Sequence, residues 1–202
     1  LISREDVRED LRQADWVSLK IDSAHEGVWR RIDRPHRRLR LSPVLDGMLE
    51  FARSYKGKLV TETMLVRGVN DGDEQIRELA SFLARLSPAC AYLAIPTRPP
   101  AEAWVHAPDE GAVIRAHQLL SERVERVEYL IGYEGNAFAS SGDLTEDLLG
   151  ITAVHPMREE AVGELLARAG GNWLTVRELI AQGRLVEMEY EGHNFYMRRI
   201  GR

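Results

Sequence analysis

The sequence predicts an α/β fold with parallel strands and helices, followed by a small domain of another kind. Three observations carry this prediction. Strand-like and helix-like patterns alternate through residues 3–135, a linker of small residues follows at 134–143, and three short helical patterns and a hairpin come after it. Alternation of this kind is typical of parallel sheets joined by right-handed crossovers. We therefore expect two domains, residues 1–138 and 139–202.

Strict periodicity marks the early elements. Residues 3–14 predict a helix with Ser3 as N-cap, and residues 42–57 predict another with Ser42 as cap and Gly57 as stop. The strand between them, "DWVSLKIDS", alternates with period two, which predicts two faces of different character. The further predicted elements are strands at 61–71, 90–100 and 127–135 and helices at 73–87 and 109–124.

The sequence after the linker predicts three helices followed by a β-hairpin. Helices are predicted over residues 144–156, 158–171 and 172–183, and the hairpin over 184–200 turns near Glu191 and Gly192. Three short helices followed by a hairpin is the order of a winged helix.

Composition narrows the class of protein. The 202 residues are 44% apolar and 29% charged, as in ordinary soluble proteins, and the net charge of −5 argues against a nucleic-acid-binding face over the whole molecule. No apolar run approaches the ~20 residues needed to cross a bilayer, so we expect no membrane partner. The single cysteine, Cys90, excludes an internal disulfide framework and fits a reducing cytoplasm. Because the chain begins at Leu1, in mid-pattern, we expect it to be part of something longer.

Charged residues interrupt strands that would otherwise be buried. In the strand at 15–23 one face is apolar and the other carries Ser18, Lys20 and Asp22, while Glu62 lies in the next strand and Arg98 at the end of the third. Ligands of parallel α/β folds bind at the carboxyl ends of strands. Alternating signs of charge suit a zwitterionic ligand with hydroxyl groups; the alternative is that these groups pair with one another around a solvated sheet edge.

Two loops are also candidates. "RGVNDGDE" has ordinary turn chemistry, and its acidic residues argue against a bound phosphate. Six arginines fall between Arg30 and Arg40, which would suit a phosphate-rich substrate such as tRNA or form a solvated loop. The sequence contains no HExxH, CxxC, P-loop or GxGxxG motif, and its six histidines have no metal-binding spacing. These absences disfavour an unrelated small α/β enzyme.

Several segments, in order, resemble the radical S-adenosylmethionine superfamily. They are "ADWVSLKIDSAHEGVWRRIDRPH", with a RINRPH-like motif at residues 31–36, "MLEFARSYKGKLVTETMLVRGVND", with an LVPGVND-like motif at 65–71, and "YLAIPTRPPAEAWV", with TRPP at 97–100. The chain looks most like the Fe-S oxidoreductases related to the tRNA-wybutosine synthesising and pyruvate formate-lyase activating enzymes. Likeness covers residues 1–104 and weakens beyond.

This resemblance implies the C-terminal half of a partial (β/α)6 barrel, whose interior binds S-adenosylmethionine against a [4Fe-4S] cluster and generates a 5′-deoxyadenosyl radical. It implies that the cofactor-binding residues are Ser18, Lys20, Asp22, Glu62 and Arg98. Within the two loop motifs, the residues expected to contact substrate are Arg34, His36, Asn70 and Asp71.

One departure from the family is decisive for the expected activity. Its cluster is held by three cysteines in CxxxCxxC, and this chain has only Cys90. We therefore expect the chain to contribute part of a cofactor and substrate site to a longer enzyme, with no cluster ligands, no catalytic residue and no tightly bound cofactor of its own. The substrate class (tRNA, protein or small molecule) stays open.

The alternative interpretation is a winged-helix module that contacts nucleic acid or a protein partner. Its third helix, with Arg177, would enter a groove, and Arg184, Arg198 and Arg199 would touch phosphates. Glu178 on the same helix and the glutamates of the hairpin argue against DNA.

Overall fold

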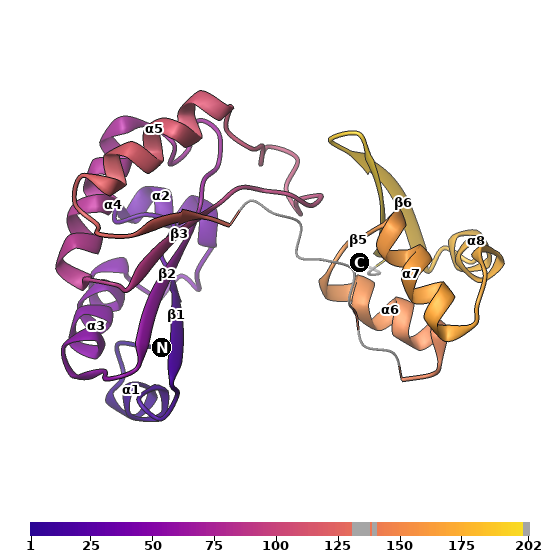
Figure 1. Ribbon diagram of the computed structural model, residues 1–202, viewed down its shortest axis with the longest axis horizontal. Coiled ribbons are helices and arrows are strands. Elements are labelled where there is room, and N and C mark those ends of the chain that lie inside the picture. The colour runs from indigo at the N-terminus through magenta and orange to yellow at the C-terminus, as the bar shows by residue number, and fades with distance from the viewer. Residues whose placement is uncertain (131–137, 139–140, 200–202) are drawn as a thin grey trace. The chain divides into compact units, whose positions relative to one another are not determined.

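The computed structural model describes residues 1–130, 138 and 141–199. By their contacts these residues form two compact units (Figure 1): a larger unit of residues 1–97 and 102–130, and a smaller unit of residues 98–101, 138 and 141–199. The predicted boundary between residues 138 and 139 adjoins residues outside the described part and stays a prediction. No helix among the described residues has the length and apolar character needed to cross a membrane.

The larger unit is a four-stranded parallel sheet with strand order β1-β2-β3-β4. Its elements are α1 Glu5–Leu11, β1 Trp16–Lys20, α2 Glu26–Asp33, α3 Leu41–Ser54, β2 Lys58–Met64, α4 Asp73–Leu86, β3 Cys90–Ala94, α5 Glu110–Ser121 and β4 Val127–Tyr129. The mixed α/β fold with a parallel sheet is thereby confirmed. Closure into a barrel stays a prediction.

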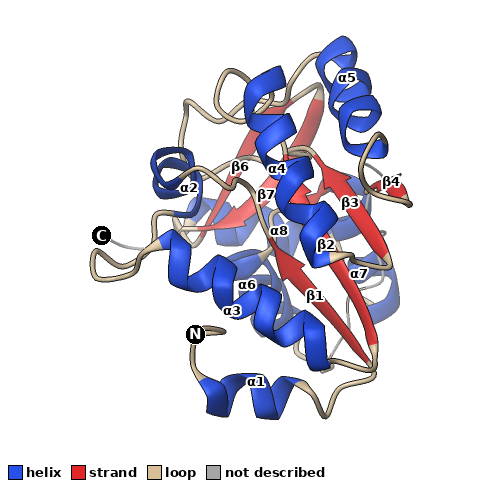
Figure 2. Cartoon of the chain, turned by 90° about the vertical axis from the view of Figure 1, so that its left-hand side faces the viewer, coloured by secondary structure: helices blue, strands red, loops and turns tan. Residues whose placement is uncertain are grey.

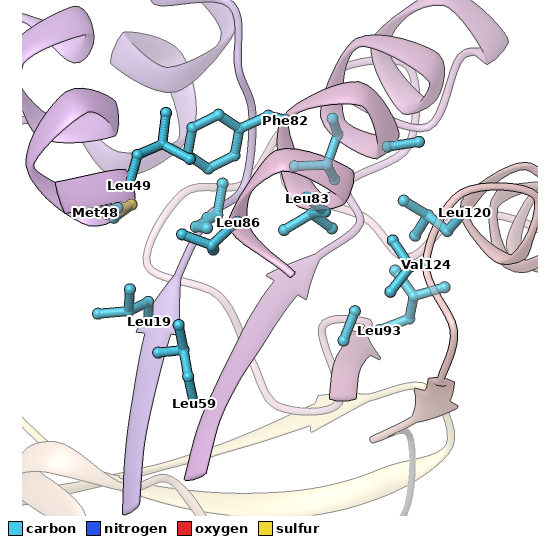
Figure 3. Close-up of a cluster of buried hydrophobic side chains, with 14 of the residues drawn as sticks. Leu19, Met48, Leu49, Leu59, Phe82, Leu83, Leu86, Leu93, Leu120 and Val124 are labelled. Atoms are coloured by element: carbon cyan, nitrogen blue, oxygen red, sulfur yellow. The ribbon is translucent and has the colours of Figure 1, made fainter. Parts of the chain in front are cut away.

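One face of the sheet forms the core against α3, α4 and α5 (Figure 2). Side chains at alternate positions along β1, β2 and β3 point into it, as their period-two pattern requires. Figure 3 shows Leu19, Leu59 and Leu93 of the strands facing Leu83 of α4 and Leu120 of α5. Burial of these side chains fixes the register of the strands and so aims the alternate residues away from the helices.

Two features of this unit differ from the sequence prediction. The first four residues of the arginine-rich run, 30–33, are helical, because α2 extends to Asp33 and ends at Arg34 in a left-handed conformation, φ 46°. The predicted N-caps Ser3 and Ser42 are wrong: Arg4 and Arg40 occupy those positions without a side-chain cap. The carboxylate of Glu26 on α2 instead accepts the N–H of Leu41, at 2.7 Å, and so caps the first turn of α3.

The smaller unit contains the predicted three helices and hairpin, with one additional short strand. Its elements are α6 Leu144–Val154, β5 Met157–Arg158, α7 Glu159–Ala169, α8 Trp173–Ala181, β6 Leu185–Tyr190 and β7 His193–Arg198. The strands form an antiparallel sheet of order β5-β7-β6, with the turn at Glu191 and Gly192 as predicted. Leu148, Val162 and Leu165 pack with Met157 and Tyr196 in its core. Its assignment as a winged helix stays a prediction.

Candidate functional site

Asp22 is the buried anchor at the carboxyl end of β1. Its side chain is wholly inaccessible to solvent, while that of Lys20 is 53% exposed. One carboxylate oxygen of Asp22 accepts the backbone N–H of Met64 at 2.8 Å, and the other accepts a hydrogen bond from the Lys20 ammonium group. The buried charge therefore has both a backbone donor and an opposite charge, the condition under which a carboxylate tolerates burial.

The carboxylate of Glu62 lies beside this pair on the next strand. Lys20 and Glu62 are register partners of the parallel sheet, so their side chains emerge on the same face. The hydroxyl of Ser18 donates to Oε1 of Glu62 at 2.9 Å. Ser18, Lys20, Asp22 and Glu62 thus lie together at the ends of β1 and β2, and their contact with a cofactor stays a prediction. We call the sheet face that bears Ser18, Lys20 and Glu62, opposite to the helix-packed core, the uncovered face.

The polar residues of the uncovered face continue onto the neighbouring strands β3 and β4. Glu62 pairs in register with Tyr92 of β3, which in turn pairs with Glu128 of β4. Arg126 Nε donates to Oε1 of Glu128 at 2.7 Å. The pKa of Tyr92 is raised by the adjacent Cys90 and by burial. The uncovered face thus presents a hydroxyl, an ammonium group, two carboxylates and a phenol across four strands.

Asn70 organises the turn that follows β2. Its side chain is buried, and its amide nitrogen donates to the carbonyl oxygens of Asp22 and Met64, both at 2.9 Å. Its amide oxygen accepts the N–H of Val66 at 2.7 Å. Both amide donors are therefore used inside the protein, and the structure gives Asn70 a positioning role. Its predicted contact with substrate stays a prediction.

Asp33, the last residue of α2, is the functional candidate that the sequence reasoning missed. Desolvation, together with the neighbouring Asp22 carboxylate, raises the pKa of Asp33 to about 7, although Lys20 opposes the shift. The residue as a whole is exposed to solvent. Its position is where "RIDRPH" departs from the RINRPH-like motif, a signal that was readable in the sequence.

The remaining predicted residues lie in surface segments. Arg34 forms an ion pair with Glu102, and the ring of exposed His36 accepts the N–H of Arg38 at 3.3 Å. Asp71 accepts the N–H of Gly68 at 2.8 Å. Their contact with substrate stays a prediction.

Arg98 is grouped differently from the other predicted cofactor-binding residues. It belongs to the segment Arg98–Ala101, which is grouped with the smaller unit, whereas Lys20 and Glu62 lie in the larger one. The site described above is therefore built without it, and its contact with cofactor stays a prediction.

The donor set does not fit an iron-sulfur cluster. Cluster iron is held by several thiolates, and the only cysteine is the buried Cys90, whose pKa is raised by burial. Among the described residues no group of three or more His, Cys, Asp or Glu side chains could hold a metal ion. On the uncovered face Lys20 and Glu62 present opposite charges side by side, as the predicted zwitterionic ligand would require.

The chain is similar to several curated proteins. A UPF0026 protein of Methanocaldococcus jannaschii is 40% identical over 202 residues, which cover 99% of this chain and 63% of that protein. A UPF0026 protein of Helicobacter pylori strain J99 is 31% identical over 93 residues, 46% of this chain and 30% of that protein. This chain thus spans less than two thirds of the length of these relatives. No protein-family profile matches it.

Two solved structures share its fold. A domain of pyruvate-formate lyase-activating enzyme from Bacteroides vulgatus has a TM-score of 0.53 at 17% identity, covering 64% of this chain and 76% of that chain. A radical SAM methyltransferase from Sphaerobacter thermophilus has a TM-score of 0.55 at 17% identity, covering 67% of this chain and 39% of that chain. At this identity the likeness shows a common fold, which supports the resemblance seen in the sequence motifs at the level of architecture.

Proposed function

We propose that this chain is the C-terminal part of a radical S-adenosylmethionine enzyme and supplies part of the cofactor site from its uncovered face. The observation that carries the proposal is the register pairing of Lys20 with Glu62 in a sheet that shares its fold with radical SAM enzymes. A parallel sheet with charged side chains on the face away from its helices is typical of a barrel interior or a cleft. We infer that the full-length protein completes a partial (β/α)6 barrel and resides in the cytoplasm.

Each of the predicted cofactor-binding residues has a role in this proposal. The Lys20 ammonium group would pair with the carboxylate of the cofactor's amino-acid part, and the Glu62 carboxylate with its ammonium group. Ser18, which already donates to Glu62 at 2.9 Å, holds that carboxylate in place. Asp22 is buried behind Lys20 and fixes the ammonium group at the strand end. We propose that Arg98 contacts the ribose and adenine of the cofactor.

The cluster ligands must come from residues other than those described. S-adenosylmethionine bound to a reduced [4Fe-4S] cluster supplies a 5′-deoxyadenosyl radical, and Cys90 alone cannot ligate that cluster. The role of this chain is to bind and orient the cofactor and the substrate. Arg34, His36, Asn70 and Asp71 are the proposed substrate-facing positions, and the substrate class is open among tRNA, protein and small molecules.

The test is anaerobic reconstitution of the full-length protein with iron and sulfide, followed by its visible spectrum. We expect the broad absorption of an iron-sulfur cluster, which changes when S-adenosylmethionine is added. The matched control is the 202-residue chain alone, which should show no such absorption because it has one cysteine. A full-length protein that acquires no cluster would overturn the proposal. The nucleic-acid interpretation of the smaller unit remains a separate prediction, tested by a salt-dependent mobility shift with duplex DNA.

A further inference from the structure

A hollow on the surface of the larger unit, which we call the α3–α4 hollow, lies away from the uncovered face. Its volume is about 570 Å³, within the range of about 300–1,000 Å³ that small-molecule sites occupy. It is lined by Leu49, Ala52 and Arg53 from α3 and by Arg85, Leu86 and Ser87 from the end of α4. Both helices end here, shortly before β2 and β3 begin, so the hollow lies at the amino ends of the strands. Cofactor and substrate sites of parallel α/β folds lie at the carboxyl ends, so this hollow is a separate feature.

The side chains that line the α3–α4 hollow offer hydrogen-bond donors and no carboxylate. The guanidinium groups of Arg53 and Arg85 come from two different helices, and a guanidinium group can only donate. The hydroxyl group of Ser87 lines the same hollow. Within the described part of the chain, none of these three exposed side chains has a hydrogen-bond or ion-pair partner. Unpartnered donors with two positive charges favour an oxyanion such as a carboxylate or a phosphate.

A role in stabilising the helix ends does not account for this arrangement. The helix dipole favours basic side chains in the last turn of a helix, and both Arg53 and Arg85 are placed there. That effect acts on each helix separately. It does not require the two guanidinium groups to line one hollow, and it leaves their hydrogen-bond donors available to a ligand.

The apolar floor of the hollow continues beyond the arginines. A second hollow of about 280 Å³ shares Leu49 and Arg85 with the first, and it is also lined by Leu45 of α3 and Phe82 of α4. Figure 3 shows Leu49 beside Phe82. Leu45, Leu49 and Ala52 are spaced i, i+4 and i+7, so they line one side of α3 over about 10 Å. An apolar chain could therefore lie along this side of the helix.

Charge gives a ligand one orientation across the two hollows. The second hollow is also lined by Glu26 and Asp46, whose carboxylates would repel an anion. The first hollow contains the two arginines and no acidic residue. The anionic end of a ligand therefore belongs beside Arg53 and Arg85, and its apolar chain points toward Leu45.

We propose that the α3–α4 hollow binds a small amphipathic anion. Its carboxylate or phosphate group accepts hydrogen bonds from Arg53, Arg85 and Ser87, and its apolar chain packs on Leu49 and Phe82. The site is distinct from the cofactor site, and the inference does not rest on the proposed function. Because the ligand contacts α3 and α4 together and needs both helices folded, its binding stabilises the larger unit.

Direct binding tests the chemical class of the ligand. The probes are octyl phosphate, octanoate and the neutral 1-octanol, each titrated into the full-length protein below any micelle-forming concentration and followed by calorimetry. We expect both anions to bind, and 1-octanol to bind about tenfold more weakly or less, because it cannot form charge-assisted hydrogen bonds with the arginines. The relative affinity of the two anions distinguishes the head groups. Binding of 1-octanol as tight as that of the anions, or no binding of either anion, would overturn the proposal.

Two variants locate the site. Arg85→Gln keeps a hydrogen-bond donor and removes one positive charge, so the Kd for octyl phosphate should rise by about tenfold or more. Arg77→Gln makes the same change in an exposed arginine of α4 that lies outside the hollow, and it should leave Kd unchanged. The Nε–H signals of Arg53 and Arg85 in an NMR spectrum should shift on addition of the probe. Equal effects of the two variants, or arginine signals that do not shift, would refute the site.

A competition experiment separates this site from the cofactor site. Saturating S-adenosylhomocysteine should leave the Kd for octyl phosphate unchanged, because the hollow and the uncovered face lie on opposite sides of the sheet. Displacement of the probe would show that it binds at the cofactor site and would overturn the proposal. A full-length protein that does not bind S-adenosylhomocysteine would count against the proposed function, and the probe titrations and variants would still decide the α3–α4 hollow.

Discussion

The side-chain amide of Asn70 donates a hydrogen bond to the backbone carbonyl of Asp22 over 2.9 Å, so the turn after β2 holds the end of β1 in place. The same nitrogen donates to Met64, whose own N–H is bonded to the Asp22 carboxylate. The backbone carbonyl and the carboxylate of Asp22 are therefore both held by hydrogen bonds from residues at the end of β2 and in the turn after it. The position of the Lys20 ammonium group, which bonds to Asp22, therefore depends on these hydrogen bonds.

Asn70→Ala should destabilise the larger unit by about 2–4 kcal/mol, because it leaves buried backbone groups of Asp22, Met64 and Val66 without partners. Chemical denaturation of wild type and variant measures the difference. Asp71→Ala is the matched control: it removes one exposed hydrogen bond, to Gly68, and should cost about 1 kcal/mol or less. Equal losses in both variants would contradict the central position given to Asn70.

Asp33→Asn should change how stability depends on pH. The folded-state pKa of Asp33 is about 7, above its ordinary value of 3.8, so between these values the folded state binds the proton more readily than the unfolded one. Stability from this group is complete below about pH 4 and is lost as pH rises to about 7. Because the residue is partly exposed, we expect wild type to lose about 1–2 kcal/mol more than Asp33→Asn across this window. Parallel stability curves for the two proteins would contradict the raised pKa.

Gly47→Ala tests how the N-terminal segment packs on α3. A Cβ at this position would lie 2.6 Å from the carbonyl oxygen of Ile2 and 2.8 Å from the Cα of Ser3. The backbone must move to relieve this contact, at a cost of about 1–3 kcal/mol. Gly150→Ala, in α6, is the control: nothing lies within 4 Å of its Cβ, and the gain in helix propensity should leave stability equal or higher. Thermal unfolding that ranks the two variants the other way would refute the packing described.

Lys20→Gln should weaken S-adenosylhomocysteine binding to the full-length protein by about tenfold or more, a loss of about 1.4 kcal/mol. Glutamine retains an N–H donor for Asp22 but removes the positive charge. Lys58→Gln makes the same change in an exposed side chain at the other end of the neighbouring strand and should leave Kd unchanged. Calorimetric titration of both variants measures the effect, and an equal effect of the two would show that only the overall charge of the protein matters.

Much of this arrangement could be predicted from the sequence. The period-two pattern of "DWVSLKIDS" is a local property, and it placed Ser18 and Lys20 on one face before any neighbouring strand was known. Glu62 could be placed beside Lys20 because parallel strands in a βαβ unit are adjacent.

Asp33 could not be found in this way. It lies among arginines in a short helix that the sequence analysis did not predict, and only the folding of α2 brings it near Asp22. The N-caps failed for a related reason: the group that caps α3 is Glu26, fifteen residues away from Leu41 in the chain. Contacts of this kind are set by tertiary packing, which local sequence patterns do not contain.

The most direct test of the central claim is the yield of 5′-deoxyadenosine from the reconstituted, reduced full-length protein with S-adenosylmethionine. Wild type should form it, and Glu62→Ala should form much less, with the cluster absorption unchanged, because the cluster ligands are proposed to lie outside the described residues. A full-length protein with an intact cluster that forms no 5′-deoxyadenosine, or a Glu62→Ala variant with wild-type yield and cofactor affinity, would contradict the assignment of this face as a cofactor site.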